Sequence, residues 1–382
     1  MKILIEAGLI VGTAESVRNA YLGIDSGIVN VISKEKPPSF EDAELLLGGK
    51  NRVVTPGYIG FDIFPSVYPF RFKLFSKKLT LKDIYSTLDN NDIYQFSLIS
   101  AYHLLKMGIT TAVISDKNVD TAARAFMDVG IRPLITINVG CNDFPQDWEK
   151  ELRTVSSRWG LNNVVLKVCD QNELKSVLEI SSQYKILTIL DNNVTISPEL
   201  YNELIKNQNI RLAAISTKRN DIDLLIKSGA GILINPYKDD VQVKGAKLGI
   251  SLGLSPTQDI RQDISSLVLK GYLSARDAFF ALTQWGCSIA GVKGGYIEVN
   301  SPTDILIYSY EEPPSFPIDY DEPYSTVLFS TYNLETVIID GEAYLDGGVP
   351  LNVGIKDVEK AIERLNEFDK RSGRKARPLE KN

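Results

Sequence analysis

Histidine is almost absent from this chain, whose 382 residues contain a single one, His103. Histidine is the commonest side-chain ligand of metal ions in proteins. A catalytic zinc site takes about three protein ligands, and one histidine supplies at most one of them. The composition therefore disfavours a metal centre built from histidines. His103 lies in the segment ISAYHLLKMG, which predicts a packed or surface residue of a helix.

Other absences narrow the class of protein further. No apolar run approaches the roughly 20 residues of a membrane-spanning helix, so no membrane association is expected. The apolar start MKILIEAGLIVG contains Glu6 and lacks a small-residue cleavage site, which predicts a strand and not a signal peptide. The 42 basic and 48 acidic residues give a net charge of −6. This balance offers no sequence-wide attraction to nucleic acid, and we expect no nucleic-acid partner.

Cysteine is also scarce. The three cysteines, Cys141, Cys169 and Cys287, form no C-x-x-C pair, which is typical of a reducing cytoplasm. Cys141 and Cys169 follow neighbouring predicted strands and are expected to approach each other, where we interpret them as two buried thiols. A thiol nucleophile would need a base, and His103 lies away from the strand ends. These features predict a cytoplasmic globular protein without a cysteine nucleophile.

Strand and helix patterns alternate through the middle of the chain. With 44% hydrophobic residues, the chain can bury a large core. Amphipathic helical segments separate short apolar strands, which we expect at 58–64, 109–115, 132–140, 163–170, 185–193, 210–216, 230–236 and 247–255. Eight such units favour an α/β fold with a closed, parallel (β/α)8 TIM-like barrel over an open sheet.

Both ends of the chain show a different pattern, of short strands with turns. After the barrel region, strands are expected at 294–299, 303–310, 326–331 and 335–348. We predict a small β-sandwich domain split between 1–55 and 296–350, the barrel at 56–295, and a C-terminal part at 351–382. Within the C-terminal part, residues 355–370 predict an amphipathic helix followed by a basic tail from Lys370 to Arg377. The apolar stripe of this helix contains Val358, Ile362, Leu365 and Phe368.

Several segments together carry a resemblance to a known family. AYLGIDSGIVNVIS is similar to an entry hairpin, NRVVTPGYIGFD to a first barrel strand, and LLKMGITTAVISD to a second. SGAGILINPYKDD is similar to a seventh strand, and LSARDAFFALTQWGCSIAGVKGGYIEVNSPTDILIYS to the helix and hairpin after the eighth. In this order and spacing, over nearly the whole chain, they resemble the amidohydrolase superfamily, in its chlorohydrolase and nucleobase- or nucleoside-deaminase branch. The resemblance implies a barrel with a composite β-sandwich, and a divalent metal that activates water against C–N or C–Cl carbons.

The resemblance also implies a ligand set from which this sequence departs. Members hold the metal with two histidines on strand 1, one on strand 5, one on strand 6 and an aspartate on strand 8. The corresponding positions here carry Asp62 and Phe64, Leu190, Ala214, and Ser255. The proton-shuttling glutamate corresponds to a position near Asn193, and a shift of one residue would bring Asp191 inward in place of Leu190. We predict no metal cofactor; the alternative is a weakly held Mg²⁺ or Mn²⁺ on Asp62, with or without Asp191.

A buried ion pair is the predicted replacement for the metal charge. Lys167 shares its strand face with Val165 and Cys169, and this face points into the barrel. A buried lysine needs a partner, so we expect Lys167 to pair with Asp62. The alternative is a Schiff-base or general-base lysine with a lowered pKa. The candidate catalytic residues are Asp62, Lys167 and Asp191, and the candidate pocket residues are Phe64, Asn138, Cys169, Asp170, Asn193, Asn235 and Ser255.

Two functions are compatible with these observations. The first is an amidohydrolase-like protein without metal-dependent catalysis, which binds a small molecule at the barrel mouth in a binding, regulatory or assembly role. It would form homo-oligomers or associate with an active relative. The alternative is a divergent hydrolase of non-peptide C–N bonds in small cyclic or nucleobase-like substrates. The absent histidines favour the first function, and the polar strand ends favour the second.

Overall fold

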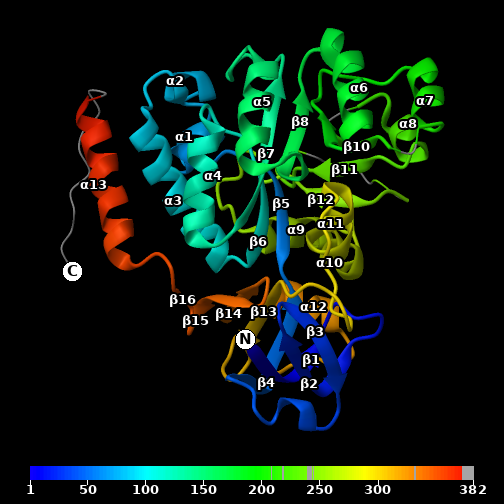
Figure 1. Cartoon of the computed structure of the whole chain (residues 1–382), viewed down its shortest axis with the longest axis vertical. Helices are drawn as coiled ribbons and strands as arrows, with labels where there is room; N and C mark the ends of the chain where they lie inside the picture. Colours follow the sequence, from blue (N-terminus) through cyan, green and yellow to red (C-terminus); the bar gives the residue numbers. More distant parts are fainter. Residues whose placement is uncertain (208, 217–218, 239–242, 244, 331–332, 372–382) are drawn as a thin grey trace.

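Figure 1 shows a computed structural model of the chain, which describes residues 1–207, 209–216, 219–238, 243, 245–330 and 333–371. One eight-stranded sheet is parallel throughout and forms the barrel. Its strands, in sheet order, are β5 (Tyr58–Ile63), β6 (Ile109–Ile114), β7 (Arg132–Val139), β8 (Val164–Val168), β9 (Leu187–Leu190), β10 (Arg211–Ile215), β11 (Gly231–Ile234) and β12 (Leu248–Ile250). The Leu252 amide donates to the Phe61 carbonyl at 2.8 Å and joins the last strand to the first. The predicted (β/α)8 barrel is confirmed.

Helices follow the strands and cover the outside of the barrel (Figure 1). They are α3 (Asn90–Lys106), α4 (Val119–Val129), α5 (Trp148–Trp159), α6 (Leu174–Tyr184), α7 (Pro198–Leu204), α8 (Ile222–Lys227), α9 (Ile260–Leu269), α10 (Ala275–Leu282) and α11 (Gln284–Ala290). Alternate strand residues face the helices and the barrel interior, as the period of a β-strand requires. On β10, Ala214 packs in the cluster with the helices, while Ala213 and Ile215 belong to the inner cluster.

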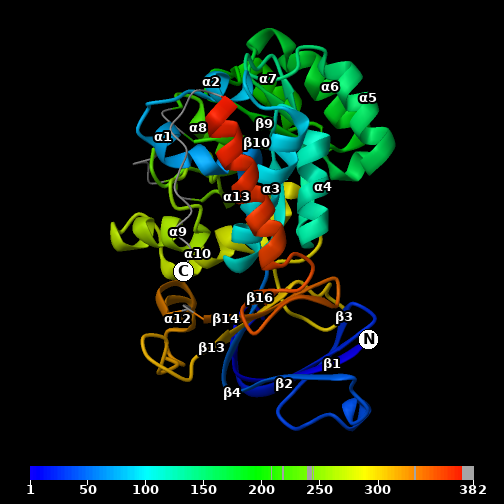
Figure 2. The ribbon, with the colours of Figure 1, turned by 90° about the vertical axis from the view of Figure 1, so that its left-hand side faces the viewer.

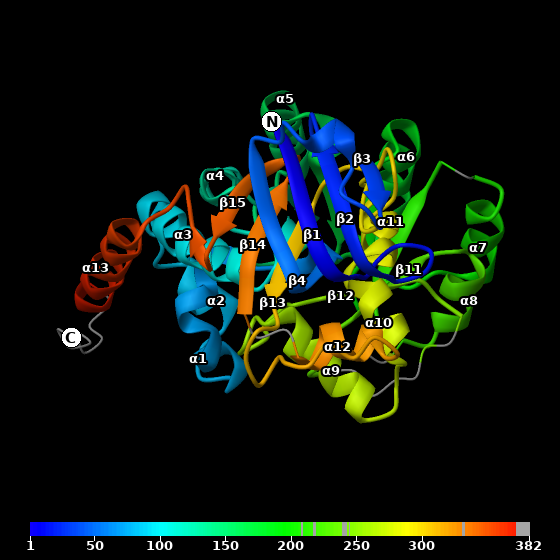
Figure 3. The same cartoon turned by 90° about the horizontal axis from the view of Figure 1, so that it is seen from below.

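The two ends of the chain share a second sheet, seen in Figure 3. Its order is β16 (Val349–Pro350), β15 (Glu342–Asp346), β14 (Asn333–Ile339), β13 (Ile305–Ser309), β4 (Leu45–Pro56), β1 (Lys2–Ile10), β2 (Val17–Asp25) and β3 (Ile28–Ser33). β4 joins the two halves, because it pairs with β1 in parallel and with β13 antiparallel. All eight strands are hydrogen-bonded into one continuous sheet, so a second domain is built from both ends of the chain as predicted.

Two predicted strands of the C-terminal half are wrong. Residues 294–299 form no strand; the Ile297 amide makes a single bond to the Gly12 carbonyl at 2.9 Å. The segment 326–331 was expected as a strand, but its described residues belong to α12 (Pro323–Ser330). Tyr324, Val327 and Leu328 have the three- and four-residue spacing of a helix face as well as apolar strand character, and the aromatic contact of Tyr324 with Phe279 at 5.4 Å selects the helix.

The C-terminal helix α13 (Ile355–Arg371) lies beside α3 on the outside of the barrel (Figure 2). Leu365 and Phe368 are buried as predicted, Val358 is half-buried and Ile362 is 36% exposed, because only a narrow side of the helix meets α3. The predicted basic tail after Arg371 lies outside the described residues. No described helix has both the length and the apolar composition that a membrane crossing needs.

Candidate functional site

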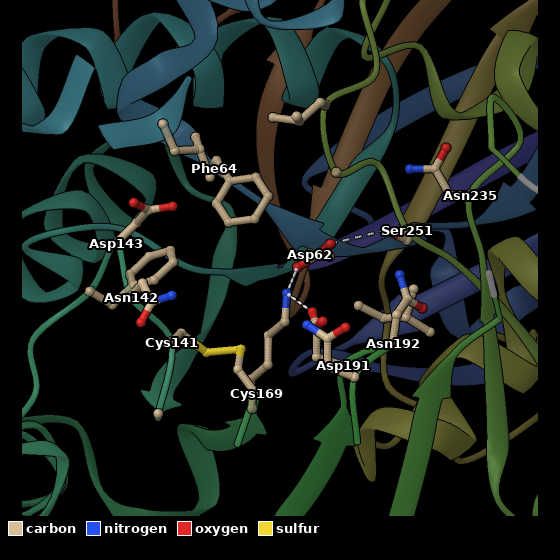
Figure 4. Close-up of a pocket in the computed structure, with 18 of the residues that line it drawn as sticks. Asp62, Phe64, Cys141, Asn142, Asp143, Cys169, Asp191, Asn192, Asn235 and Ser251 are labelled. Carbon is tan, nitrogen blue, oxygen red and sulfur yellow. Dashed lines mark hydrogen bonds and ion pairs between the residues drawn. A yellow bond between two sulfur atoms is a disulfide. The ribbon is translucent and has the colours of Figure 1, made fainter. Parts of the chain in front are cut away.

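A cavity of about 320 Å³ opens at the carboxyl ends of the barrel strands (Figure 4). Its polar lining comes from Asp62, Asn142, Asp143, Lys167, Asp191, Asn192, Asn193, Asn235, Lys238 and Ser251. Active sites of barrel enzymes lie at this end, because loops from every strand converge there. The segment between β5 and α3, which contains α1 (Arg71–Phe75) and α2 (Leu81–Tyr85), contributes Leu81 to the cavity.

Asp62 has an unusual backbone at the end of β5. Its φ of 56° is left-handed, and the strand register shifts between Gly60 and Ile63. Aspartate tolerates this conformation better than most residues, but it still costs free energy, and such strain concentrates at functional sites. The turn directs the carboxylate into the cavity, where its side chain is 11% exposed.

Lys167 lies between two carboxylates. Its ammonium Nζ donates to Asp62 Oδ1 at 2.7 Å and stands 3.5 Å from Asp191 Oδ2, and dashed lines in Figure 4 mark these contacts of the labelled Asp62 and Asp191. The Lys167 side chain is only 8% exposed. The Ser251 hydroxyl donates to the other oxygen of Asp62 at 3.3 Å. Burial acts to lower the pKa of Lys167, but the charges of Asp62 and Asp191 outweigh it and raise the pKa. Lys167 is therefore an ammonium ion at neutral pH.

A buried arginine holds the loop that carries Asp191. The Arg219 Nη1 donates to the Asp191 carbonyl at 2.9 Å, and Nη2 donates to the Val194 carbonyl. Arg219 is paired in a fork with Asp221, with both N–O distances at 2.9 Å and both side chains almost fully buried. A bidentate pair of this kind fixes geometry as well as charge. Arg219 is thus a positioning residue for the wall that contains Asp191.

Aromatic rings form another wall of the cavity. The Phe64 ring is 6% exposed and lies 6.2 Å from the Phe144 ring, measured between centroids. Lys167 Nζ lies 5.7 Å from the centroid of Phe64, within reach of a cation–π interaction. Phe64 stands at a position where the resemblance implies a metal ligand, and its ring faces the ammonium instead.

The two pocket cysteines are joined, which corrects the prediction of two buried thiols. Cys141 and Cys169 form a disulfide with a Cα–Cα distance of 5.1 Å. The parallel pairing of Val139 with Val168 brings the residues after these strands together, and the Cys169 amide donates to the Val139 carbonyl at 2.9 Å. Sequence reasoning placed the two side by side but treated the low cysteine count as a sign of a reducing compartment. The disulfide removes that argument for a cytoplasmic location, which stays a prediction.

The donor set of this site does not fit the family's divalent metal. The carboxylates of Asp62 and Asp191 already share the Lys167 ammonium. A cation bound between them would meet this positive charge, and Phe64 and Ile215 offer no ligand atoms. Among the residues that the structure describes, no group of three histidine, cysteine, aspartate or glutamate side chains is arranged to hold a metal.

Three of the aligned positions were misplaced. Leu190 and Ala214 pack outward against the helices, whereas Asp191 and Ile215, one residue later, line the cavity. The predicted pocket residue Ser255 lies beyond the strand, and its hydroxyl donates to Asp263 Oδ2 of α9 at 2.7 Å. Successive side chains of a strand point to opposite faces, so an alignment error of one residue exchanges the residues that face the barrel interior with those that face the helices. The one-residue shift that would bring Asp191 inward is the arrangement observed.

The remaining predicted residues divide into three groups. Phe64, Cys169, Asn193 and Asn235 line the cavity. Asn138 is 2% exposed and faces the barrel interior beside Lys167, below the cavity rather than on its surface. Asp170 was predicted in the pocket but points out of it, because its side chain accepts the Asn172 amide at 3.0 Å and caps the following turn. The roles of all these residues remain predictions.

Sequence reasoning missed several lining residues. Ser251 has the inward parity of β12, shared with Gly249, and could have been found by pairing β12 with β11. Asn142, Asp143 and Phe144 follow β7 in a loop without a recognisable motif, and no pattern in the sequence indicates that they turn back over the mouth. Lys238, which follows Asn235 in the loop after β11, also lines the cavity, and no sequence pattern indicates it either.

His103 takes no part in this site. It lies in α3 with its ring 5.3 Å from the Tyr68 ring, and it does not line the cavity. Burial, with the nearby charge of Arg71, lowers the pKa of His103, so the ring is neutral at pH 7. Of the two predicted alternatives, a packed or a surface residue of a helix, the structure shows the packed one.

Comparison with known proteins shows the fold. No protein-family model and no curated protein matches the chain. Among solved structures, an adenosine deaminase from Xanthomonas campestris with bound zinc is similar over 96% of this chain and 98% of its own, with 14% identity and a TM-score of 0.79. A triazine hydrolase from Arthrobacter aurescens is similar over 96% and 99%, with 15% identity and a TM-score of 0.78. An amidohydrolase from a Sargasso Sea environmental sample is similar over 98% and 100%, with 13% identity and a TM-score of 0.78.

Proposed function

We propose that this chain, which has the fold of the amidohydrolase superfamily, binds a small polar molecule at the barrel mouth and acts as a binding or regulatory protein without metal-dependent hydrolysis. The observation that carries this proposal is the Lys167 ammonium, 2.7 Å from Asp62 and 3.5 Å from Asp191. The ammonium supplies the positive charge that the two partly buried carboxylates need. It supplies no coordination position at which a water could be activated.

The protonation of Lys167 argues against the alternative in which this residue is a base or a Schiff-base nucleophile. Both roles need the neutral amine, and therefore a lowered pKa. Here the neighbouring carboxylates raise the pKa above its ordinary value. Lys167 is better suited to donate hydrogen bonds to a bound oxygen or nitrogen atom than to remove a proton.

The cavity has the size and chemistry of a small-molecule site. Its volume of about 320 Å³ is at the lower end of the range for ligand pockets. Three carboxylates, two ammonium groups and four asparagine side chains border it, so both donors and acceptors are present. A compact molecule with several polar groups, such as a small heterocycle or amide, would match this lining.

Metal analysis and ligand screening test the proposal together. The protein would be incubated with Zn²⁺, Mn²⁺ and Fe²⁺, desalted and analysed by mass spectrometry for bound metal, with an Asp62→Asn variant in parallel. We expect substoichiometric metal in both.

A panel of nucleobases, nucleosides and small amides would then be screened by thermal shift, with hits repeated on Lys167→Met and on Lys247→Met, a surface variant outside the cavity. Binding lost only in Lys167→Met supports the site; one tightly held ion per chain, lost in Asp62→Asn together with a hydrolytic activity, contradicts the proposal.

A divergent C–N hydrolase remains the second candidate. The observation in its favour is the Asp191 side chain, which is 23% exposed and stands beside a protonated lysine. This arrangement offers a carboxylate base and an ammonium acid within one cavity. Product analysis of the same panel separates the two functions: turnover that disappears in Asp191→Asn would support the hydrolase, whereas binding without turnover supports the first function. Association with itself or with an active relative stays a prediction, measurable by light scattering.

A further inference from the structure

The disulfide between Cys141 and Cys169 lies in the wall of the candidate pocket. Both cysteines line the cavity; Cys141 is 6% exposed and Cys169 is partly exposed. Cys169 follows Lys167 by two residues and faces the same side, so the bond lies next to the charged centre (Figure 4). A disulfide that borders a solvent-accessible cavity is open to attack by a small reductant, unlike one buried in a core.

The bond anchors one particular segment, residues 140–147 between β7 and α5, which we call the wall loop. The wall loop contributes Asn142, Asp143 and Phe144 to the cavity. Its internal hydrogen bonds close the loop on itself: the Phe144 amide and the Gln146 side chain both donate to the Cys141 carbonyl, at 3.2 and 3.1 Å. The wall loop is therefore a small, internally hydrogen-bonded unit.

Strand pairing and the bond from the Cys169 amide to the Val139 carbonyl place the start of the wall loop, and ring contacts of Phe144 hold its tip over the mouth. The Phe144 ring lies 6.2 Å from the Phe64 ring and 5.8 Å from the Tyr85 ring. Ring contacts of this kind are weak compared with a covalent cross-link to β8. The Cys141–Cys169 bond is thus a covalent attachment of this wall beside Lys167.

We propose that the Cys141–Cys169 bond is a redox switch of the pocket. In the oxidised protein the bond fixes the wall loop beside the Lys167–Asp62–Asp191 centre. In the reduced protein the wall loop moves away from β8, and the centre becomes accessible to solvent. The redox state of the cell compartment would then set whether the pocket has its closed, ligand-binding shape.

The reaction requires a dithiol reductant, which supplies two electrons. One thiolate of the reductant attacks the sulfur of Cys169, the more exposed cysteine. The Cys141–Cys169 bond breaks, and Cys141 leaves as a thiolate that takes up a proton. The second thiol of the reductant then attacks the mixed disulfide, releases Cys169, which takes up a proton, and leaves the reductant as its own disulfide.

Acetylation of Lys167 measures the state of the wall. Oxidised protein, and protein reduced with a dithiol and desalted without oxygen, would be treated with acetic anhydride and analysed by peptide mass spectrometry. We expect Lys167 to be modified about tenfold faster after reduction, because its protection depends on local opening of the wall loop. Lys247, on the surface and outside the cavity, should be modified at the same rate in both states. Iodoacetamide labelling counts the thiols that reduction has freed.

Two variants complete the experiment. A Cys141→Ser/Cys169→Ser protein should show the fast Lys167 rate with or without reductant. Cys287→Ala, which removes the free buried cysteine and leaves the bond intact, should keep the redox response. Equal Lys167 rates in the oxidised and reduced proteins, a bond inert to the dithiol, or loss of the folded circular-dichroism spectrum on reduction would each overturn the proposal. The measurement uses no ligand, so its failure leaves the proposed function standing.

Discussion

Lys167 is the residue on which the candidate site depends. Its side chain is 8% exposed and its ammonium lies within 3.5 Å of two carboxylates, so removing it leaves two partly buried negative charges close together. The left-handed backbone of Asp62 and the inward face of β8 both serve this contact. A buried ion pair contributes little net stability, but breaking it by removing one partner is costly. Single substitutions at Lys167 therefore have a larger effect on the free energy of unfolding than the net contribution of the ion pair suggests.

The substitution Lys167→Met keeps the length of the side chain and removes the charge. We expect it to lower the free energy of unfolding by about 3 kcal/mol, because Asp62 and Asp191 lose their buried counter-ion. Adding Asp62→Asn to this variant should recover part of the loss, since one of the two repelling charges is then gone. Urea unfolding of the single and double variants measures both values. A single variant as stable as the wild type would mean that the pair is solvated in solution.

Glu151 of α5 gives a prediction about pH. Burial raises the pKa of Glu151 to about 7, above its ordinary value of 4.5. The folded state therefore favours the protonated carboxyl, so this residue's contribution to stability is complete below pH 4.5 and is lost as the pH rises through 7. Glu151→Gln should match the wild type near pH 4 and exceed it at pH 8, by on the order of 1 kcal/mol once solvent screening is considered. Thermal melts across this pH range check whether the two proteins diverge as the pH rises; a constant offset would contradict the prediction.

At the scale of elements, the loops after the strands determine the shape of the mouth. The loop after β9 carries Asp191 and is fixed by Arg219, while the wall loop is fixed by the disulfide. These two attachments lie on neighbouring sides of Lys167, one non-covalent and one covalent. The charged centre is thus held by β5, β8 and the loop after β9, and the cavity around it by bonds between loops.

Arg219→Lys tests the non-covalent attachment. A lysine keeps the charge beside Asp221 but cannot make the fork to its carboxylate and also reach the Asp191 and Val194 carbonyls. We expect a loss of about 2 kcal/mol in unfolding free energy, and faster amide hydrogen exchange at 191–194. Arg153→Lys, on the exposed surface of α5, is the matched control and should change neither quantity. Unchanged exchange at 191–194 would show that the loop holds its shape without Arg219.

Sequence patterns predicted the elements better than their details. The alternation of apolar strands with amphipathic helices located all eight barrel strands, because the period of each element is written locally. The helix α12 was mistaken for a strand, since a short apolar run fits either structure until its packing partner, Phe279, is known. The inward parity of Lys167 predicted its contact with Asp62, whereas Leu190 and Ala214 were placed one residue off. The strand pattern placed Cys141 and Cys169 side by side, but the shape of the wall loop depends on how chain segments meet, and no local pattern encodes that.

For the whole molecule, the ends of the chain close the structure around the barrel. β4 and β13 join the two terminal halves in one sheet, and Arg132 of β7 links that sheet to the barrel through Asp304 at 2.9 Å. At the other side, α13 covers α3. The C-terminal helix is thus an integral part of the fold and not an appendage.

Deleting residues 355–382 should destabilise the whole chain. Arg364 and Arg371 donate to the buried carboxylate of Asp92 at 2.7 Å, and the Phe368 ring lies 5.3 Å from Phe70 and 5.9 Å from Phe96. The deletion leaves Asp92 without these guanidinium groups and exposes the two rings, so we expect to lose more than about 3 kcal/mol of unfolding free energy. Deleting only 372–382 keeps every one of these contacts and should leave the melting temperature unchanged. Calorimetry of the two truncations distinguishes the role of α13 from that of the segment after it, and equal melting temperatures would show that the barrel is stable without its C-terminal helix.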